Sequence, residues 1–223
     1  MHHFIQVTRS KEVGFIVTTM VLTIGMTLLS AYFDWGYLSA LLLAIGMYGA
    51  IAIFAVWFSD RFLKTLLLFG IAAGFTELIA DAWLVNGINS LVYPAQEPKI
   101  WASPIYMPFA WAVVLIQVSY LGWLYAQHHS LPKAMGLSFL IGILFIPMFE
   151  TCAKFADWWH YRPSPMILNT PIYIIVGEGL ITLVLPLIYD KEKNKPYSFF
   201  AIAGILQGIW VFISYFLAYQ AFG

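Results

Sequence analysis

FLKTLLLFGIAAGFTELIADAWLV, residues 62–85, is a long apolar run that contains one basic and two acidic side chains. A transmembrane helix needs about 20 mainly apolar residues to cross the hydrocarbon core of a bilayer. A strand of a membrane barrel would alternate apolar and polar side chains over about ten residues, and this run does not. The stretch therefore predicts a transmembrane helix.

Six further stretches meet the same criterion and are separated by polar or proline-containing breaks. They are residues 13–33, 37–58, 105–126, 134–155, 171–189 and 198–222. The 223-residue chain is 61% hydrophobic and 10% charged, which is far more apolar than a soluble domain. The sequence predicts an all-α, polytopic integral membrane bundle of seven transmembrane helices, forming a single transmembrane domain over residues 1–223.

Basic residues indicate the orientation, because cytoplasmic loops are enriched in Lys and Arg. A cytoplasmic N-terminus places most of the basic residues inside: Arg9, Lys11, Arg61, Lys64, Lys133, Lys191, Lys193 and Lys195. Lys99, Lys154 and Arg162 remain outside. We expect an exoplasmic C-terminus and a multi-pass protein of the cell membrane, with the lipid bilayer as its partner. The 11 basic and 11 acidic residues balance, which argues against a nucleic-acid partner. Oligomeric state stays open.

Four acidic residues fall in the outer half of this topology: Glu77, Asp81, Glu150 and Glu178. An ionised carboxylate inside a membrane is costly, so such residues usually face the bundle and carry a function. Glu150 has a structural alternative, because Lys154 follows it by one helical turn. Asp157 is a further catalytic candidate. It also has a structural alternative, which is an ion pair with Arg162 across the same loop.

Glycines accompany these acids. Gly70 and Gly74 lie one and two turns before Glu77 on the same face, and such a small-xxx-small surface lets another helix approach closely. Gly177 and Gly179 flank Glu178 and leave space beside its carboxyl. We therefore expect the acids to point into helix interfaces.

Aromatic and polar side chains supply candidates for substrate binding around the acids. They are Trp83, Tyr106, Trp111, Trp158, Tyr173, Gln207 and Trp210. For the tryptophans, anchoring at the membrane interface is an alternative, and for aromatics at helical spacing so is ordinary packing.

An internal echo relates two predicted helical hairpins, residues 62–126 and 134–189. TELIADAW is followed by SPIYMPFAW, and FETCAKFADWW is followed by TPIYIIVGE. Each hairpin thus combines an acid, an Asp-Trp element, a loop and Pro-Ile-Tyr. If the echo reflects a repeat, it pairs both hairpins around one pocket.

The chemistry is narrowed by residues that the chain lacks. Its five histidines and single cysteine, Cys152, do not form a metal-binding pattern, and no glycine-rich phosphate loop or GxSxG motif is present. We expect no metal and no cofactor. Burial away from water favours a protonated carboxylic acid, so Glu77 or Glu178 can serve as a proton donor, while Trp and Tyr faces stabilise a developing cation.

The motifs TELIADAW, SPIYMPFAW, DWWHY and TPIYIIVGE, on a seven-span chain of this length, resemble the integral-membrane terpene cyclases of meroterpenoid pathways. They are also similar to membrane carotenoid hydratases, whose loops combine Glu, Trp and Pro before a helix. The resemblance implies that Glu77 takes the place of the cyclases' essential early acid. The later acid is then Asp157 or Glu178.

Three functions stay open at this point. The first is an enzyme that acts on an isoprenoid-like or other lipophilic alkene by carboxylic-acid proton transfer, as a cyclase, hydratase or isomerase. The second is a small transporter coupled to protons or cations. The third is a membrane subunit without catalytic activity, whose acids stabilise helix contacts or bind a partner.

Overall fold

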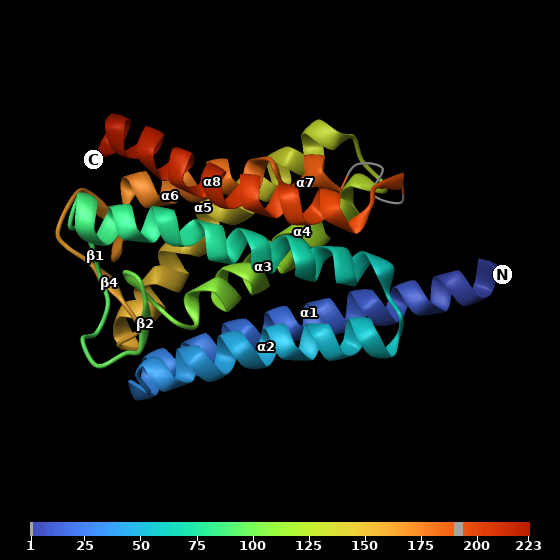
Figure 1. The fold of residues 1–223 in the computed structure, drawn as a ribbon, viewed down its shortest axis with the longest axis horizontal. Helices are drawn as coiled ribbons and strands as arrows, with labels where there is room; N and C mark the ends of the chain where they lie inside the picture. Colours follow the sequence, from blue (N-terminus) through green and yellow to red (C-terminus); the bar gives the residue numbers. More distant parts are fainter. Residues whose placement is uncertain (1, 190–193) are drawn as a thin grey trace.

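A bundle of long helices makes up most of the protein in the computed structural model, which describes residues 2–189 and 194–223 (Figure 1). The helices are α1 (His2–Phe33), α2 (Tyr37–Trp57), α3 (Arg61–Ala82), α4 (Met107–Ala126), α5 (Leu131–Phe155), α6 (Ile172–Leu183), α7 (Leu185–Ile188) and α8 (Tyr197–Phe222). A π-helical turn, η1 (Trp83–Gly87), extends α3. Lys191 and Lys193, two of the residues used to predict the inner face, lie outside the described residues.

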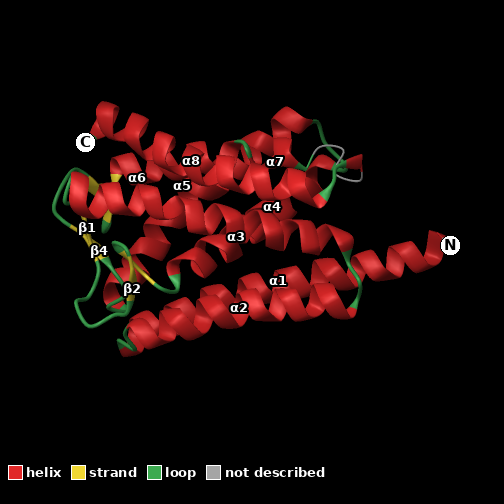
Figure 2. Ribbon diagram, viewed as in Figure 1, coloured by secondary structure: helices red, strands yellow, loops and turns green. Residues whose placement is uncertain are grey.

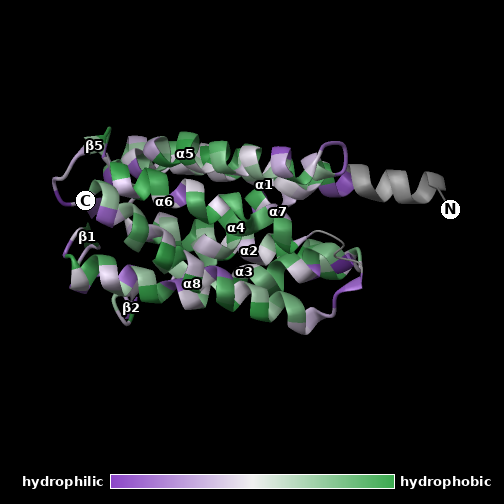
Figure 3. Ribbon diagram, turned by 90° about the horizontal axis from the view of Figure 1, so that it is seen from above, coloured by the Kyte–Doolittle hydropathy of each residue, from purple (hydrophilic) through white to green (hydrophobic). Residues whose placement is uncertain are grey.

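Six of the predicted spans are confirmed as helices that are long and apolar enough to cross a membrane: Lys11–Phe33, Tyr37–Trp57, Arg61–Gly87, Met107–Ala126, Leu131–Phe155 and Tyr197–Phe222. Their apolar residues run along the helices, and hydrophilic residues gather at the two ends of the bundle (Figure 3). The protein is therefore a multi-pass membrane protein.

The stretch predicted as a span over residues 171–189 is shorter than the others and is broken. Its apolar helix covers only Ile172–Ile188, and α6 ends at Leu183 before the four-residue α7 begins. Pro186 lies in the first turn of α7 and has no N–H to donate to a preceding carbonyl. Side chains of α8 donate to carbonyls near the end of α6: Gln207 Nε2 donates to the Ile181 carbonyl (3.0 Å) and Trp210 Nε1 to the Leu180 carbonyl (2.9 Å).

Helix α3 lies at the centre of the bundle, between α4 and α8. A Cβ added at Gly74 would lie 2.0 Å from the Pro108 carbonyl oxygen of α4, and one at Gly204 would lie 2.3 Å from the Phe69 carbonyl oxygen of α3. Only residues without a side chain allow these backbones to approach so closely. The predicted helix-contact role of the α3 glycines is thus confirmed, and α4 is the neighbour of Gly74.

Short strands and loops cluster at one end of the bundle, opposite the N-terminus (Figure 2). They are β1 (Leu91–Val92), β2 (Lys99–Ile100), β3 (Ser103–Pro104), β4 (His160–Tyr161), β5 (Met166–Ile167) and β6 (Thr170–Pro171). β1 pairs with β4, which joins the loop after α3 to the loop after α5. We call this end the loop end.

Two antiparallel hairpins at the loop end, β2–β3 and β5–β6, have the same design. They lie in EPKIWASPIY (residues 97–106) and SPMILNTPIY (residues 164–173). In each, the backbone N–H of the isoleucine before the final tyrosine donates to a proline carbonyl: Ile105 to Pro98 and Ile172 to Pro165, both at 3.0 Å. Each hairpin leads directly into a helix, so the predicted echo of Pro-Ile-Tyr corresponds to a shared local structure.

Candidate functional site

A cavity of about 280 Å³ lies between the α1–α2 pair and helices α4 and α5, and it reaches the loop end. Most of its wall is aliphatic or aromatic. Three carboxyl groups also line it: Asp81 from α3, Glu150 from α5 and Glu178 from α6. The structure therefore brings acids from three helices to one apolar cavity.

Each of these three carboxylates accepts one hydrogen bond from an aromatic side chain. The Tyr93 hydroxyl donates to Asp81 Oδ2 (2.6 Å), the Trp159 indole N–H to Glu150 Oε2 (2.5 Å) and the Tyr215 hydroxyl to Glu178 Oε1 (2.6 Å). Hydrogen bonds to a carboxylate are shorter and stronger than those between neutral groups. The aromatic donors fix the carboxyls and leave other oxygen lone pairs for the cavity.

Glu77 lies one helical turn before Asp81 in α3, is fully buried, and does not line the cavity. Its carboxyl lies beside Asp81 and the Trp111 indole and is close enough to Glu178 for the two carboxyl groups to interact electrostatically. Neither of its oxygens has a hydrogen bond of regular geometry within residues 2–189 and 194–223. Glu77 is thus a buried acid behind the cavity wall, in contact with one of the acids that line it.

The glycines on either side of Glu178 determine how its surroundings pack. Gly177, beside Glu178, has no side chain, and an added Cβ there would lie 2.4 Å from the Tyr215 ring. The ring can therefore lie against α6, where its hydroxyl donates to Glu178. Gly179, on the other side, lies against Phe139 of α5 in the same way. The predicted space beside Glu178 exists and is filled by neighbouring side chains.

No salt bridge to any of the four acids is present in the described part of the chain. Glu150 instead interacts electrostatically with Glu178 and Asp81. Glu77 interacts in the same way with Asp81 and Glu178. Several ionised carboxylates without a cation would each cost several kcal/mol in a low-dielectric interior. The cluster therefore needs protons or a bound cation. No three His, Cys, Asp or Glu side chains among the described residues are placed to hold a metal ion.

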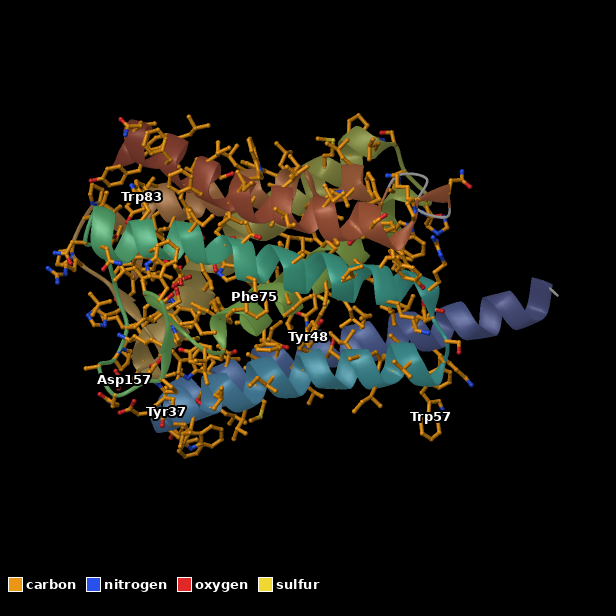
Figure 4. All side chains as sticks on the ribbon, viewed as in Figure 1. Tyr37, Tyr48, Trp57, Phe75, Trp83 and Asp157 are labelled. Carbon is orange, nitrogen blue, oxygen red and sulfur yellow. The ribbon has the colours of Figure 1, made fainter. Side chains whose placement is uncertain are left out.

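The two structural alternatives weighed for the acids are not found. Lys154, the alternative partner considered for Glu150, donates to Asn169 Oδ1 at 2.7 Å, because the β5–β6 hairpin folds back over the end of α5. Asp157 is exposed in the turn after α5, where its φ of 52° reverses the chain. It does not line the cavity. Figure 4 shows Asp157 at the same end as Trp83, far from Trp57.

Three of the seven predicted substrate-binding residues line the cavity: Tyr106, Trp111 and Trp158. Trp158 is also held in place, because its indole N–H donates to Ser39 Oγ at 2.8 Å. These three rings are placed to contact a molecule in the cavity.

The other four predicted binding residues lie elsewhere. Gln207 and Trp210 donate to carbonyls in the last turn of α6, as described above. Trp83 packs edge-on against Phe212, with ring centroids 5.8 Å apart, and the Tyr173 hydroxyl bonds to Ser90 Oγ. Their contacts in the structure are with other protein groups.

The aromatic donors Tyr93, Trp159 and Tyr215 were not among the predicted site residues. Tyr215 is 37 positions from Glu178, so no local pattern links the two residues. For Trp159 there was a weak indication in the sequence, because it follows Trp158 in the DWW motif. For Tyr93 there was no indication, since a tyrosine in a proline-containing loop has no distinguishing pattern around it.

Glu97 was also missed. It is 4% exposed, although its neighbours Gln96 and Pro98 are exposed, so its side chain points inward from a surface segment. It lies beside Tyr106, and burial raises the pKa of Glu97 from 4.5 to about 7. Sequence reasoning treats an acid between Gln and Pro as a solvated loop residue, which is why it was passed over.

Residues 78–222, more than half of the chain, match a protein family described as a domain of unknown function, DUF6989. The match begins one residue after Glu77 and includes the cavity-lining acids of α3, α5 and α6. No curated protein and no solved structure matches the chain.

Proposed function

The chain belongs to the DUF6989 family, and we propose that it is a membrane-embedded enzyme that acts on a lipophilic alkene by carboxylic-acid proton transfer. The observation that carries this proposal is the set of three carboxyls, each bound by an aromatic donor, that line one apolar cavity. An apolar cavity binds a hydrocarbon through burial of its surface. Binding a hydrocarbon does not require carboxyl groups, so the three acids in this wall support a chemical role.

The proposed reaction starts with a protonated carboxyl of the cluster, from Asp81 or Glu178. Its proton adds to one carbon of a substrate double bond, the π electrons form the new C–H bond, and the other carbon becomes cationic. The faces of Trp111 and Trp158 stabilise that cation. Attack by a second double bond closes a ring and moves the positive charge, and the new cation then loses a proton to another carboxylate. Attack by water, followed by loss of a proton from the added water, gives an alcohol. Loss of a neighbouring proton to another carboxylate gives an isomer. These outcomes correspond to a cyclase, a hydratase and an isomerase.

Access from the membrane supports a lipid-like substrate. Four side chains of α1 and α5 line the cavity and are still 37–49% exposed: Ile24, Leu28, Phe145 and Met148. In a bilayer these exposed faces contact lipid. A hydrophobic substrate can therefore enter sideways between α1 and α5 without crossing water.

The proposed topology has seven crossings, with the broken α6–α7 segment as the sixth. The N-terminus lies in the cytoplasm and the C-terminus outside the cell membrane, as the distribution of Lys and Arg favours. The loop end and the acids then face the exoplasmic side. A reporter fused after Gly223 that is active only outside the cytoplasm checks this orientation.

The proposed reaction is tested in D₂O with purified protein in lipid micelles. Linear carotenoids and prenylated phenols serve as substrates, and mass spectrometry detects deuterium in a new C–H bond. We expect Asp81→Asn and Glu178→Gln to lower the rate about 100-fold or more, as for loss of a general acid. Asp60→Asn, at the opposite end of the bundle, is the matched control, because an Asn still caps α3.

Two results would contradict the proposal. One is full turnover in both cluster variants. The other is proton flux across vesicles without any chemical product, which would favour the transporter hypothesis instead.

A further inference from the structure

Glu97 is a buried acid that the proposed reaction does not use. It lies in the exposed segment of residues 95–100, and it alone in that segment is buried. Neither of its carboxylate oxygens has a hydrogen bond of regular geometry within the described residues. A buried carboxyl with so little compensation costs stability, so its position calls for an explanation other than folding.

The β2–β3 hairpin places Glu97 next to Tyr106. Lys99 pairs with Pro104 and Ile100 with Ser103, and the Ile105 N–H bonds to the Pro98 carbonyl. Continuing this antiparallel register by one step puts Glu97 opposite Tyr106. Tyr106 is the N-cap residue of α4, so the end of the hairpin places the Glu97 carboxyl beside the Tyr106 phenol.

Tyr106 connects this position to the cavity. It is 2% exposed, lines the cavity, and feels the charges of Glu97, Asp81 and Asp157. Asp81 in turn has the Tyr93 and Ser103 hydroxyls beside it. Hydroxyl groups can accept one proton while they release another. The Glu97 carboxyl, the Tyr106 hydroxyl and the Ser103 hydroxyl therefore lie between the surface segment and Asp81, and none of them has a hydrogen bond of regular geometry within the described residues.

We infer that Glu97 and Tyr106 form the entry route by which protons from water reach Asp81. Glu97 gives its proton to the Tyr106 oxygen as the Tyr106 hydroxyl releases its own proton toward Asp81, and water then reprotonates Glu97. In each cycle the product cation or the added water gives a proton to another carboxylate, so Asp81 itself needs a new proton, and the route supplies it. The inference rests on the proposed acid function of the cluster, for which it supplies the proton source.

The groups around Glu97 suit this role. Burial, the largest influence, and the exposed Asp157 favour the protonated form of Glu97, whereas Tyr106 and the positive Lys99 favour its ionised form. The balance leaves a pKa of about 7, so both forms are populated near neutral pH. A group that exchanges protons with water in both directions needs that property.

The experiment follows proton exchange without any substrate. Protein reconstituted in lipid is moved from H₂O to D₂O, and infrared spectroscopy records how fast the carbonyl bands of protonated carboxyls shift. We expect Glu97→Gln to slow the exchange of the buried bands about tenfold or more, because an amide cannot pass the proton on. Glu97→Asp keeps a titratable group and should exchange within a fewfold of wild type.

Asp60→Asn is again the control, since it converts a buried carboxyl at the other end to an amide. Wild-type exchange in Glu97→Gln would overturn the inference, as would equal slowing in Asp60→Asn or in Glu97→Asp. The exchange experiment uses no substrate, so it tests the proton route even if no catalysed reaction is found. Conversely, a negative result for the proton route does not affect the D₂O product assay of the cluster variants.

Discussion

The β2–β3 and β5–β6 hairpins have nearly the same backbone but different polar partners. In the β5–β6 hairpin, Asn169 accepts from Lys154, and the Tyr173 hydroxyl bonds to Ser90. In the β2–β3 hairpin, the tyrosine at the matching position, Tyr106, lines the cavity, and a buried glutamate lies opposite it. Ser164 occupies the matching position in the β5–β6 hairpin.

This difference separates what the fold needs from what the site needs. The β5–β6 hairpin forms the same turn and leads into a helix in the same way without a buried acid. Glu97 is therefore not required to build such a hairpin. Its burial beside the cavity instead supports a role in proton transfer, and the predictions below compare the two hairpins directly.

The largest expected effect comes from the helix contacts beneath the hairpins. A Cβ at Gly74 would lie 2.0 Å from the Pro108 carbonyl oxygen, whereas one at Gly142 would lie 2.5 Å from the Thr182 hydroxyl, which can rotate, and 2.6 Å from the Glu178 carbonyl oxygen. We expect Gly74→Ala to destabilise the protein by about 3 kcal/mol or more, and Gly142→Ala by less. Unfolding in mixed detergent micelles measures both.

Gly136→Ala is the control for these substitutions, because nothing lies within 4 Å of an added Cβ there. It should be neutral or slightly stabilising, since Ala favours helix more than Gly does. Equal stability of Gly74→Ala and Gly136→Ala would show that α3 and α4 are farther apart than described.

The second prediction concerns pH. Burial raises the pKa of Glu97 from 4.5 to about 7, so between these values the folded protein binds more protons than the unfolded chain. Its contribution to the free energy of unfolding is full below about pH 4.5 and falls as pH rises to about 7. The fall is at most about 3 kcal/mol.

Stability measured between pH 4.5 and 8 tests this. Glu97→Gln should lose that part of the pH dependence. Ser164→Ala, at the matching position of the β5–β6 hairpin, should keep it. The same slope in wild type and Glu97→Gln would mean that the Glu97 carboxyl is solvated.

The third prediction compares the two tyrosines. Tyr106→Phe should slow proton exchange of the buried carboxyls about tenfold, because it removes the hydroxyl between Glu97 and the cavity. Tyr173→Phe should leave exchange unchanged and cost about 1 kcal/mol of stability through loss of the bond to Ser90. Exchange that is slowed equally by both would point to a general loosening of the loop end.

The smallest expected effect lies at the hairpin turns. Trp101 and Leu168 occupy matching positions with φ values of 57° and 56°, in the left-handed region that a side chain disfavours. Leu168→Gly should stabilise the protein by about 0.5–1 kcal/mol, and Trp101→Gly by a similar amount. Thermal unfolding checks both, and a loss of stability in both would show that the exposed side chains anchor the loops.

Much of the architecture could be predicted because it depends on composition and length. Six spans are apolar runs near the length a bilayer requires, and the close contact at Gly74 followed from the small residues on one face of α3. The prediction of the sixth span was less accurate, because a count of apolar residues does not detect that the helix is interrupted near Pro186.

The sequence by itself determined that this chain belongs in a membrane and that Glu77, Asp81, Glu150 and Glu178 are its unusual residues, since a charge in an apolar run is visible without knowing any neighbour. Only the tertiary structure decided which acids line the cavity, which aromatic groups bind them, and that Glu97 lies beside Tyr106. Those facts depend on contacts between helices and across a hairpin, and residues far apart in sequence leave no local pattern that records which of them meet.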